Sequence, residues 1–452
     1  MQNSLKVIKF GGTSMADIPS MRKCADIVAS DPSRKVIIVS ATSGTTDQLC
    51  QLCKALTKSE KKELLFQIRK RHLELSHQLT PSNNKFPSVD ELLDELTEFV
   101  IGMDTISLGD RDHILSFGER LSSSVFASTL SELDSQVIWV DVKDVLLTDD
   151  FHGKAEPQIE QIALRAKEKL LPLLKKGRVV SQGFIGSTID GKTTTLGRGG
   201  SDYSAALFAE ALSAKTLEIW TDVSGIFSTD PRIVKDAFPI KEISFNEAAE
   251  LAIYGAKVLH PATLKAAIRK KTNVFVGKSM QAELGGTWIL EKTSSSPSVR
   301  GISFRRNQKL LTIHSLDMLH QFGFLARVFE ILSRFKISVD LVTTSEVNIS
   351  LTLDTGIQSD FNYQNLEEAL KELKRFCKLS IETDLALIAL IGNQLNQTAG
   401  ISGKIFQVLE DINIRLICYG ASSHNICFLV RDEDTVRTVQ ILHQQFLSKN
   451  VE

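Results

Sequence analysis

The feature that most restricts the fold of this chain is an internal repeat in its last third. Residues 310–353 align without a gap onto residues 387–430, at an offset of 77. Each copy has the pattern of a strand, a helix and two further strands, which predicts a small α+β module rather than a solenoid repeat. Matched positions carry identical residues: Gly323 and Gly400, Phe329 and Phe406, Leu332 and Leu409, Ile337 and Ile414, Ser345 and Ser422, and Asn348 and Asn425.

The residues before this repeat alternate short apolar strands with helical periods. Strands are predicted at 6–10, 35–40, 136–142, 178–186, 216–223 and 273–277. Helices are predicted at 19–30, 119–133, 159–175, 203–212, 246–253 and 261–270. This alternation predicts an α/β domain with a mostly parallel central sheet and helices on both faces. Residues 54–108 are charged and helical, with a loop at 81–87, and we expect an inserted or peripheral helical lobe there.

Composition places the domain boundaries and limits the classes of function. The stretch EKTSSSPS has the composition of a linker, so we expect a domain at 1–290, a linker at 291–304 and modules at 305–382 and 383–452. A net charge of −1 offers no basic excess for a nucleic-acid partner. No run approaches the roughly 18 apolar residues of a membrane helix, and the N-terminus lacks a signal-peptide core. We expect a cytoplasmic protein.

Six cysteines in 452 residues do not indicate a disulfide framework. Cys50 and Cys53 form a C-x-x-C pair, followed by His72 and His77, and four such side chains can bind zinc. The segment between the two pairs is charged and amphipathic, however, and is longer than the spacer of a zinc finger. The pattern favours ordinary thiols on helices, and we expect no metal ion held by protein side chains alone.

Two glycine-rich pieces lie close together between residues 183 and 206. The first, Gly186 to Thr193, matches the phosphate-binding pattern G-x-x-x-x-G-K-[ST]. That loop must open a helix, but here T-T-T-L-G-R-G-G follows, and β-branched residues and glycines make a poor first turn. Asp190-Gly191 is instead a two-residue hairpin signal, so the match is predicted to be a coincidence.

The second piece, G-R-G-G-S-D at 197–202, is the better anion site. Its glycines let backbone N–H groups approach an anion, Arg198 adds a cation, and Ser201 or Asp202 is predicted to cap the next helix. K-F-G-G-T-S at 9–14 predicts a similar anion site, because Lys9 lies at the end of a strand and beside a glycine turn. Together the two loops predict a site for a transferring phosphoryl group.

With these loops in view, the chain resembles the aspartokinase family. The resemblance rests on K-F-G-G-T-S at 9–14, S-x-x-S-G-T-T-D at 40–47, F-G-E at 117–119, T-T-L-G-R-G-G-S-D at 194–202, W-T-D-V-S-G-I-F-S-T-D-P-R at 220–232 and G-A-K-V-L-H-P-A-T at 255–263. It implies a three-layer amino-acid-kinase domain followed by two ferredoxin-like ACT modules. M-L-H-x-x-G-F-L-A at 318–326 and S-V-D-L-V-T-T-S-E at 338–346 resemble the lysine-sensitive monofunctional class.

The resemblance implies a reaction and assigns residues to it. ATP would phosphorylate the β-carboxylate of L-aspartate to give 4-phospho-L-aspartate and ADP, the first step of the aspartate-family pathway, with Mg²⁺ bound through the nucleotide. Lys9 and Asp202 would be the catalytic pair. The residues implied for aspartate are Ser40, Thr46, Glu119, Arg198, Gly199, Gly200 and Ser201. Those implied for ATP are Lys9, Gly11, Gly12, Thr221, Asp222, Phe227, Arg232 and Lys257. The chain departs from the family pattern at two positions. Many relatives have Tyr where this chain has Phe227, and Pro where it has Ser224. One hydroxyl contact to the nucleotide is therefore expected to be missing.

The repeat also allows the two modules to be compared with each other. Asp340 aligns with Ile417 and Glu346 with Ser423, so only the first module carries two acids around 338–346. Two carboxylates suit a ligand with two ammonium groups. With the resemblance, this predicts lysine as the effector, with threonine and diaminopimelate as alternatives. The effector residues implied are Met318, Gly323, Phe324, Leu325, Ser338, Val339, Asp340, Thr344, Ser345 and Glu346.

Two other functions remain open from the sequence. One is a related amino-acid kinase acting on glutamate, acetylglutamate or carbamate, and the other is a non-catalytic amino-acid sensor with the same fold. The resemblance further implies a homodimer or a dimer of dimers through the ACT modules. We expect no homoserine dehydrogenase domain, and no nucleic-acid or membrane partner.

Overall fold

The computed structural model describes residues 5–55, 57–79, 86–256, 259–319, 322–353 and 363–448. The chain forms two units, and we describe each by itself. The first comprises Met1–Ile226, Pro239–Phe245 and Lys257–Thr293, and the second comprises Phe227–Phe238, Asn246–Ala256 and Ser294–Glu452. A single boundary at residue 290 is therefore too simple, because two segments of the predicted kinase domain belong to the second unit.

Buried polar contacts explain why these two segments belong there. The backbone N–H of Ile302 donates to the Ser228 carbonyl at 2.7 Å, and the Ser228 hydroxyl lies 2.9 Å from Nε2 of His443. Glu247 is completely buried and accepts from Arg300 at 3.0 Å and from Asn393 at 2.7 Å. Such contacts join residues far apart in the chain, so no local composition pattern marks them.

The first unit is built on an eight-stranded sheet with the order β3-β4-β2-β1-β7-β9-β10-β8. Its strands are β1 (Lys6–Phe10), β2 (Arg34–Val39), β3 (Val137–Trp139), β4 (Arg178–Gln182), β7 (Thr216–Thr221), β8 (Glu242–Ser244), β9 (Asn273–Lys278) and β10 (Gly286–Leu290). Among the neighbouring pairs of these described strands, β9–β10 alone is antiparallel. The mostly parallel sheet predicted from the alternation is confirmed, although β8 and β10 were not predicted and the strand predicted at 178–186 ends at Gln182.

Helices cover both faces of this sheet. Ile8 and Phe10 of β1 share one apolar core with α1 (Ile18–Ala29) and α5 (Leu108–Ser131). Side chains alternate along a strand, so Lys9 faces the opposite side, where α8 (Gly200–Ala211) packs on β1, β2 and β7. On that side α10 (Pro261–Lys270) packs against α8. Successive buried side chains of β1 therefore contact helices on opposite faces of the sheet, which gives three layers.

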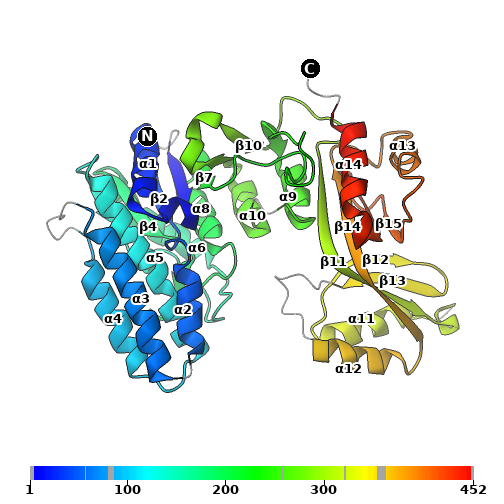
Figure 1. Cartoon of the computed structure of the whole chain (residues 1–452), viewed down its shortest axis with the longest axis horizontal. Helices are drawn as coiled ribbons and strands as arrows, with labels where there is room; N and C mark the ends of the chain where they lie inside the picture. The colour runs from blue at the N-terminus through cyan, green and yellow to red at the C-terminus, as the bar shows by residue number, and fades with distance from the viewer. Residues whose placement is uncertain are drawn as a thin grey trace. The chain divides into compact units, whose positions relative to one another are not determined.

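The helical lobe forms around α5. Its other helices are α2 (Thr45–Lys54), α3 (Lys58–Ser76) and α4 (Val89–Ile101), which lie side by side in Figure 1. Each of the last two begins at a side-chain cap, Thr57 for α3 and Ser88 for α4. The lobe expected at 54–108 is confirmed, while most of the loop predicted at 81–87 lies outside the described residues.

The segment that matches the phosphate-loop pattern forms a hairpin. Strands β5 (Ile185–Ser187) and β6 (Thr193–Thr195) pair antiparallel. The N–H of Thr188 donates to the Lys192 carbonyl at 2.9 Å, and Gly191 has a φ of +80°. The prediction that this match is a coincidence is confirmed, although the turn is longer than the expected two residues.

The remaining helices include one irregular segment. The helix predicted at 159–175 consists of α6 (Ile159–Arg165), a π-helical turn (Ala166–Leu170) and α7 (Leu171–Leu174). The helix α9 spans Phe245–Ile253, and 3₁₀ turns occupy Gly12–Met15, Val142–Asp144, Ser279–Leu284, Leu316–Met318 and Asp432–Asp434. Within the part of the chain that is described, no helix combines the length and apolar character required to cross a bilayer.

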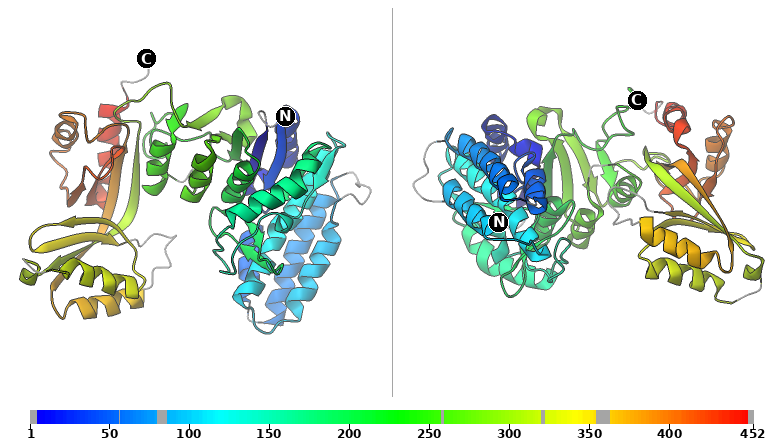
Figure 2. Two further views of the ribbon diagram at one scale, coloured as in Figure 1. Left: turned by 180° about the vertical axis from the view of Figure 1, so that it is seen from behind. Right: turned by 60° about the horizontal axis from the view of Figure 1, so that its bottom comes forward.

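The second unit contains a six-stranded antiparallel sheet with the order β12-β13-β11-β14-β16-β15. Its strands are β11 (Gly301–His314), β12 (Val339–Thr344), β13 (Asn348–Leu353), β14 (Lys378–Ile391), β15 (Leu416–Cys418) and β16 (Asn425–Arg431). Figure 2 shows α11 (Phe324–Arg334) and α12 (Tyr363–Leu373) at one end of it and α13 (Ile401–Gln407) and α14 (Thr435–Phe446) at the other. Two modules are therefore confirmed.

The two modules are not consecutive in the chain. The long strands β11 and β14 run through both, and residues Gly301–Arg305 pair with Leu387–Ile391 of the second module. Ile302 accordingly belongs to the apolar core of the second module, whereas Leu311 and Ile313 belong to the first. The boundaries predicted at 305 and 383 therefore cut through shared strands, and the predicted linker is too long because residues 301–304 form part of β11.

Candidate functional site

The candidate site lies where the parallel strands β1, β2 and β7 end at the same edge of the sheet. Lys9 is 7% exposed, and its Nζ lies 2.6 Å from Oδ1 of Asp202. The N–H of Gly11 donates to the Trp220 carbonyl at 2.9 Å. A Cβ on Gly11 would lie 3.6 Å from Nζ of Lys9 and 3.8 Å from Oγ1 of Thr221. The structure thus brings together the lysine, the first glycine turn and the end of β7.

The second glycine loop opens α8 in a way that differs from the prediction. Gly199 is the N-cap, with a φ of +72°, and Ser201 and Asp202 lie inside the first turn rather than at the cap. A Cβ on Gly199 would lie 2.6 Å from Cβ of His260, so only glycine fits this close approach. Arg198 is exposed immediately before the helix. Free N–H groups of a helix start and a cation next to them suit an anionic substrate.

Glycine is also required on the strand side of this loop. A Cβ on Gly183, just after β4, would lie 2.6 Å from Cβ and 2.7 Å from Cα of Ser201. We expect Gly183→Ala to displace the start of α8, raise the KM for the substrate held by Ser201 roughly tenfold and lower stability by about 1–3 kcal/mol. Steady-state kinetics and urea unfolding measure both effects.

The matched control for that change is Gly403→Ala. Gly403 lies within α13, and a Cβ there would meet no atom within 4 Å. It should leave kinetics unchanged and raise stability by about 0.5–1 kcal/mol, because alanine is the better helix former. If Gly183→Ala kept the wild-type KM and stability, the packing of Ser201 against Gly183 would not matter to the site.

Glu119 brings a buried carboxylate to the same edge from α5. It is 4% exposed, and its Oε1 accepts the N–H of Ala41 at 3.1 Å. Its Oε2 is buried and has no hydrogen-bond partner among the described residues. Burial raises the pKa of Glu119 to about 8, opposed by the Ala41 N–H and by the charge of Lys9. An unpartnered buried oxygen of this kind suits a cationic ligand group.

Ser40 and Thr46 belong to the β2–α2 connection, whose Ala41 N–H donates to this carboxylate. Ser40 directly follows β2, and its N–H donates to the Phe10 carbonyl at 3.1 Å. Thr46 lies in the first turn of α2. Both side chains are partly exposed. A Cβ on Gly12 would lie 3.1 Å from the Ala41 carbonyl oxygen, so the first glycine turn contacts the same loop.

The predicted nucleotide residues are only partly brought together. Thr221 ends β7, and its hydroxyl donates to Asp222 at 3.0 Å, close to Gly11. Phe227 and Arg232 belong to the second unit, where Arg232 is exposed and paired with Asp230 at 2.7 Å. Ser224 belongs to the first unit and lies just before the segment Phe227–Phe238 of the second. Lys257 lies outside the described residues, so its predicted role stays a prediction.

Asp112 supports the site and was missed by sequence reasoning. It is 1% exposed, and one carboxylate accepts from the Thr195 hydroxyl at 2.6 Å, the Gly153 N–H at 2.9 Å and Nδ1 of His152 at 2.9 Å. Thr195 ends β6, three residues before Arg198. Asp112 lies in the charged helical stretch D-R-D-H, a pattern typical of a solvent-exposed helix face. The local sequence therefore gives no sign that Asp112 is buried.

The predicted effector residues gather around two ends of the first module. Met318, Gly323, Phe324 and Leu325 lie between β11 and the start of α11. Ser338, Val339 and Asp340 lie at the start of β12, and Asp340 is ion-paired with Arg305 at 2.5 Å. Thr344, Ser345 and Glu346 lie at its other end and are exposed.

The two acids of the predicted effector pocket are thus at opposite ends of one strand. Asp340 lies near the start of β12, and Glu346 lies in the turn after its last residue, Thr344. Four residues of extended chain already span about 13 Å, which is longer than one amino-acid ligand. The pocket with two carboxylates that the repeat predicts stays a prediction, and within one chain its two acids lie apart.

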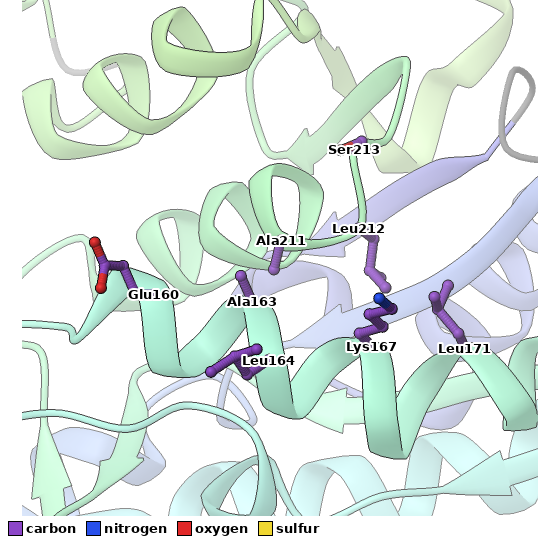
Figure 3. Close-up of a pocket in the computed structure, with 8 residues that line it drawn as sticks. All are labelled: Glu160, Ala163, Leu164, Lys167, Leu171, Ala211, Leu212 and Ser213. Atoms are coloured by element: carbon purple, nitrogen blue, oxygen red, sulfur yellow. The ribbon is translucent and has the colours of Figure 1, made fainter.

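A separate surface pocket of about 550 Å³ contains none of the predicted site residues. Figure 3 shows α6, the π-helical turn, the first residue of α7 and the segment at the end of α8 around it. Its lining is mostly apolar, with the residues Glu160, Ala163, Leu164, Lys167, Leu171, Ala211, Leu212 and Ser213. Nothing in its chemistry connects it with the two glycine loops.

Comparison with known proteins agrees with the geometry. Residues 4–278 match the amino acid kinase family, and residues 388–446 match the ACT domain. The chain is 48% identical to the lysine-sensitive aspartokinase 3 of Escherichia coli, over 98% of this chain and 99% of that protein. It is 34% identical to the chloroplastic aspartokinase 3 of Arabidopsis thaliana, over 97% of this chain and 81% of that protein.

Solved structures show the same likeness. The crystal structure of E. coli aspartokinase III in complex with aspartate and ADP, in the R-state, is 47% identical, covers 98% of this chain and 100% of its own, and superposes with a TM-score of 0.87. The structure of that enzyme in complex with lysine and aspartate, in the T-state, is 48% identical over 99% of this chain and 100% of its own, with a TM-score of 0.83.

Proposed function

The chain belongs to the aspartokinase family and phosphorylates the β-carboxylate of L-aspartate with ATP, and we propose from its geometry which residues carry this reaction. The observation on which the assignment rests is the buried Lys9–Asp202 pair beside Gly11 and Thr221, at the edge where the parallel strands end. Ligands bind at this edge in open α/β sheets.

Phosphoryl transfer here needs positioning and neutralisation of charge more than proton transfer. The β-carboxylate of the substrate is already ionised at neutral pH, so one of its oxygens attacks the γ-phosphorus of ATP without a base. The bond between that phosphorus and the bridging oxygen to the β-phosphate breaks, and ADP leaves. Lys9 stabilises the charge on the transferring group, and Asp202 holds the ammonium group of Lys9 in place.

The rest of the edge holds aspartate for this attack. We assign the α-ammonium group to Glu119, whose Oε2 is buried without a partner among the described residues. Arg198 is assigned to the α-carboxylate, because a guanidinium binds a carboxylate through two parallel hydrogen bonds. Ser40, Thr46 and the N–H groups from Gly199 to Ser201 complete the contacts. Glu119 and Arg198 thus bind the two charged groups on the α-carbon of aspartate, which leaves the β-carboxylate to face the phosphate.

Mg²⁺ fits this site as a companion of the nucleotide. Among the residues that the structure describes, no group of three His, Cys, Asp or Glu side chains is placed to hold a metal ion. Mg²⁺ is commonly bound by phosphate oxygens, water and one or two carboxylates, and Asp222 offers a carboxylate at the nucleotide end. The ion would neutralise phosphate charge there. The six cysteines are free thiols, which supports the expected cytoplasmic location.

Hydroxylamine trapping of an acyl phosphate tests the proposed reaction. Purified protein with Mg·ATP should give aspartyl hydroxamate and ADP with aspartate, and no acyl phosphate with glutamate, N-acetylglutamate or carbamate. Turnover with one of those three instead would identify a related amino-acid kinase. ATP binding without any turnover would identify a sensor that keeps only the fold.

We further propose that lysine inhibits the enzyme by binding between two copies of the first ACT module. The strand β12 is at the end of its sheet, so antiparallel pairing with β12 of a second copy, centred near Thr343, would place Glu346 of one copy opposite Asp340 of the other. Two carboxylates then face one ligand with two ammonium groups. This arrangement requires a homodimer through the first module.

Mixed dimers give this proposal a sharp test. Asp340→Asn and Glu346→Gln should each raise the lysine concentration for half-inhibition by roughly tenfold or more, because each loses a charge-assisted contact. A mixture of the two variants should recover partial inhibition, since a mixed dimer has one site with both acids intact. Inhibition assays and light scattering measure both points. If subunits exchange and inhibition does not recover, the two acids either act within one chain or do not bind lysine, and the proposal fails.

A further inference from the structure

A buried histidine of the helical lobe contacts the loop that presents Ser40 and Thr46. His72 of α3 is completely buried, and its Nε2 lies 3.1 Å from Oγ1 of Thr42. That hydroxyl lies 2.5 Å from Oγ1 of Thr45, which is also completely buried. The three side chains form a chain of hydrogen bonds from α3 to the first residue of α2.

The direction of each hydrogen bond in this chain follows from one carbonyl. Nδ1 of His72 lies 2.8 Å from the carbonyl oxygen of Ile68, which can only accept, so Nδ1 carries the proton. Burial lowers the pKa of His72 to about 4, which keeps the ring neutral and leaves Nε2 as an acceptor. Thr42 therefore donates to His72, and Thr45 donates to Thr42.

The turn between β2 and α2 carries further hydrogen bonds next to this chain. The N–H of Thr45 donates to the Thr42 carbonyl at 3.0 Å, and the N–H of the neighbouring Ala41 donates to Glu119 at 3.1 Å. The carbonyl oxygen of Ala41 is also the atom that a Cβ on Gly12 would meet first, at 3.1 Å. A rotation of Thr42 would therefore move the aspartate side and the phosphate side of the site together.

We propose that His72 is a positioning residue that holds the Ser40–Thr46 loop in its aspartate-binding form through Thr42. The helical lobe then has a role in substrate affinity, although His72 itself touches no substrate. The inference rests on the proposed assignment of Ser40 and Thr46 to aspartate.

Four variants test the hydrogen bond itself. Thr42→Val removes the donor while keeping the shape, and His72→Phe removes the acceptor. Each is expected to raise the KM for aspartate roughly tenfold and to leave the KM for ATP within about twofold. The double variant should be no worse than either single change, because both break the same bond. His72→Gln, whose amide oxygen can accept from Thr42, should recover most of the aspartate affinity.

Controls separate this role from one in stability and from the site assignment. His77→Gln changes an exposed histidine just after the same helix and should behave as wild type. Thermal unfolding is measured for every variant. A lower melting temperature with a wild-type KM for aspartate, or additive effects in the double variant, would overturn the proposal. Ser40→Ala and Thr46→Ala without any effect on that KM would instead refute the site assignment on which it rests.

Discussion

Replacing Lys9 by methionine is expected to lower kcat about a thousandfold while the KM for aspartate changes by no more than about twofold. Nζ of Lys9 is the buried cation beside Gly11 and Thr221, and it is held by Asp202. Its charge is needed most when negative charge develops on the transferring phosphoryl group, so its loss affects the chemical step more than aspartate binding. Steady-state kinetics with hydroxylamine trapping measure both constants.

The matched control lies on the same strand. Lys6 is also ion-paired, with Asp31 at 2.8 Å and Glu218 at 3.2 Å, but it stands at the opposite end of β1. Lys6→Met should lower stability somewhat and leave kcat near that of wild type. Equal losses of kcat in the two variants would mean that Lys9 acts through the fold rather than on the phosphoryl group.

Replacing Glu119 by glutamine is expected to raise the KM for aspartate by about 10- to 100-fold, with the largest effect near pH 8. Burial raises the pKa of the free carboxyl to about 8, so at lower pH the wild-type carboxyl must lose its proton before it can bind the substrate ammonium group. The wild-type KM should therefore fall as pH rises toward 8, whereas the KM of the variant should stay nearly constant. Initial rates between pH 6 and pH 8.5 measure this difference.

The same pKa predicts how stability changes with pH. The unfolded carboxyl ionises near its usual pKa of 4.5, whereas the folded one keeps its proton up to about pH 8. Between these values the folded state binds more protons, so the contribution of Glu119 to stability declines as pH rises. In urea unfolding, Glu119→Gln should lose this part of the decline between pH 5 and pH 8.

A nearby glutamate with the opposite shift is the control. The hydrogen bond from Arg120 lowers the pKa of Glu95, which lies on α4 in the helical lobe. Glu95→Gln should retain the wild-type dependence of the aspartate KM on pH. If Glu119→Gln also retained that dependence, the titrating group would not be Glu119, and the assignment of the substrate ammonium group to it would fail.

The features that sequence reasoning placed correctly depend on local patterns. Apolar strands separated by helical periods predicted the parallel sheet, and the β-branched run after Lys192 showed that the phosphate-loop pattern belongs to a hairpin. The alignment of the two modules predicted the repeated strands and helices of the second unit. The start of α8 was less predictable, because Gly199, Ser201 and Asp202 lie within four residues and each can cap a helix.

The amino-acid sequence by itself determined the fold class, the two glycine loops and the chemical type of each candidate residue, because period, turn chemistry and charge are properties of neighbouring residues. Only the tertiary structure decided that Gly183 must make room for Ser201, that Asp112 holds Thr195, and that His72 reaches Thr42. It also placed β11 in both ACT modules and set Asp340 and Glu346 at opposite ends of β12. These arrangements depend on how strands pair and helices pack across long separations, and such contacts leave no periodic signal in the chain.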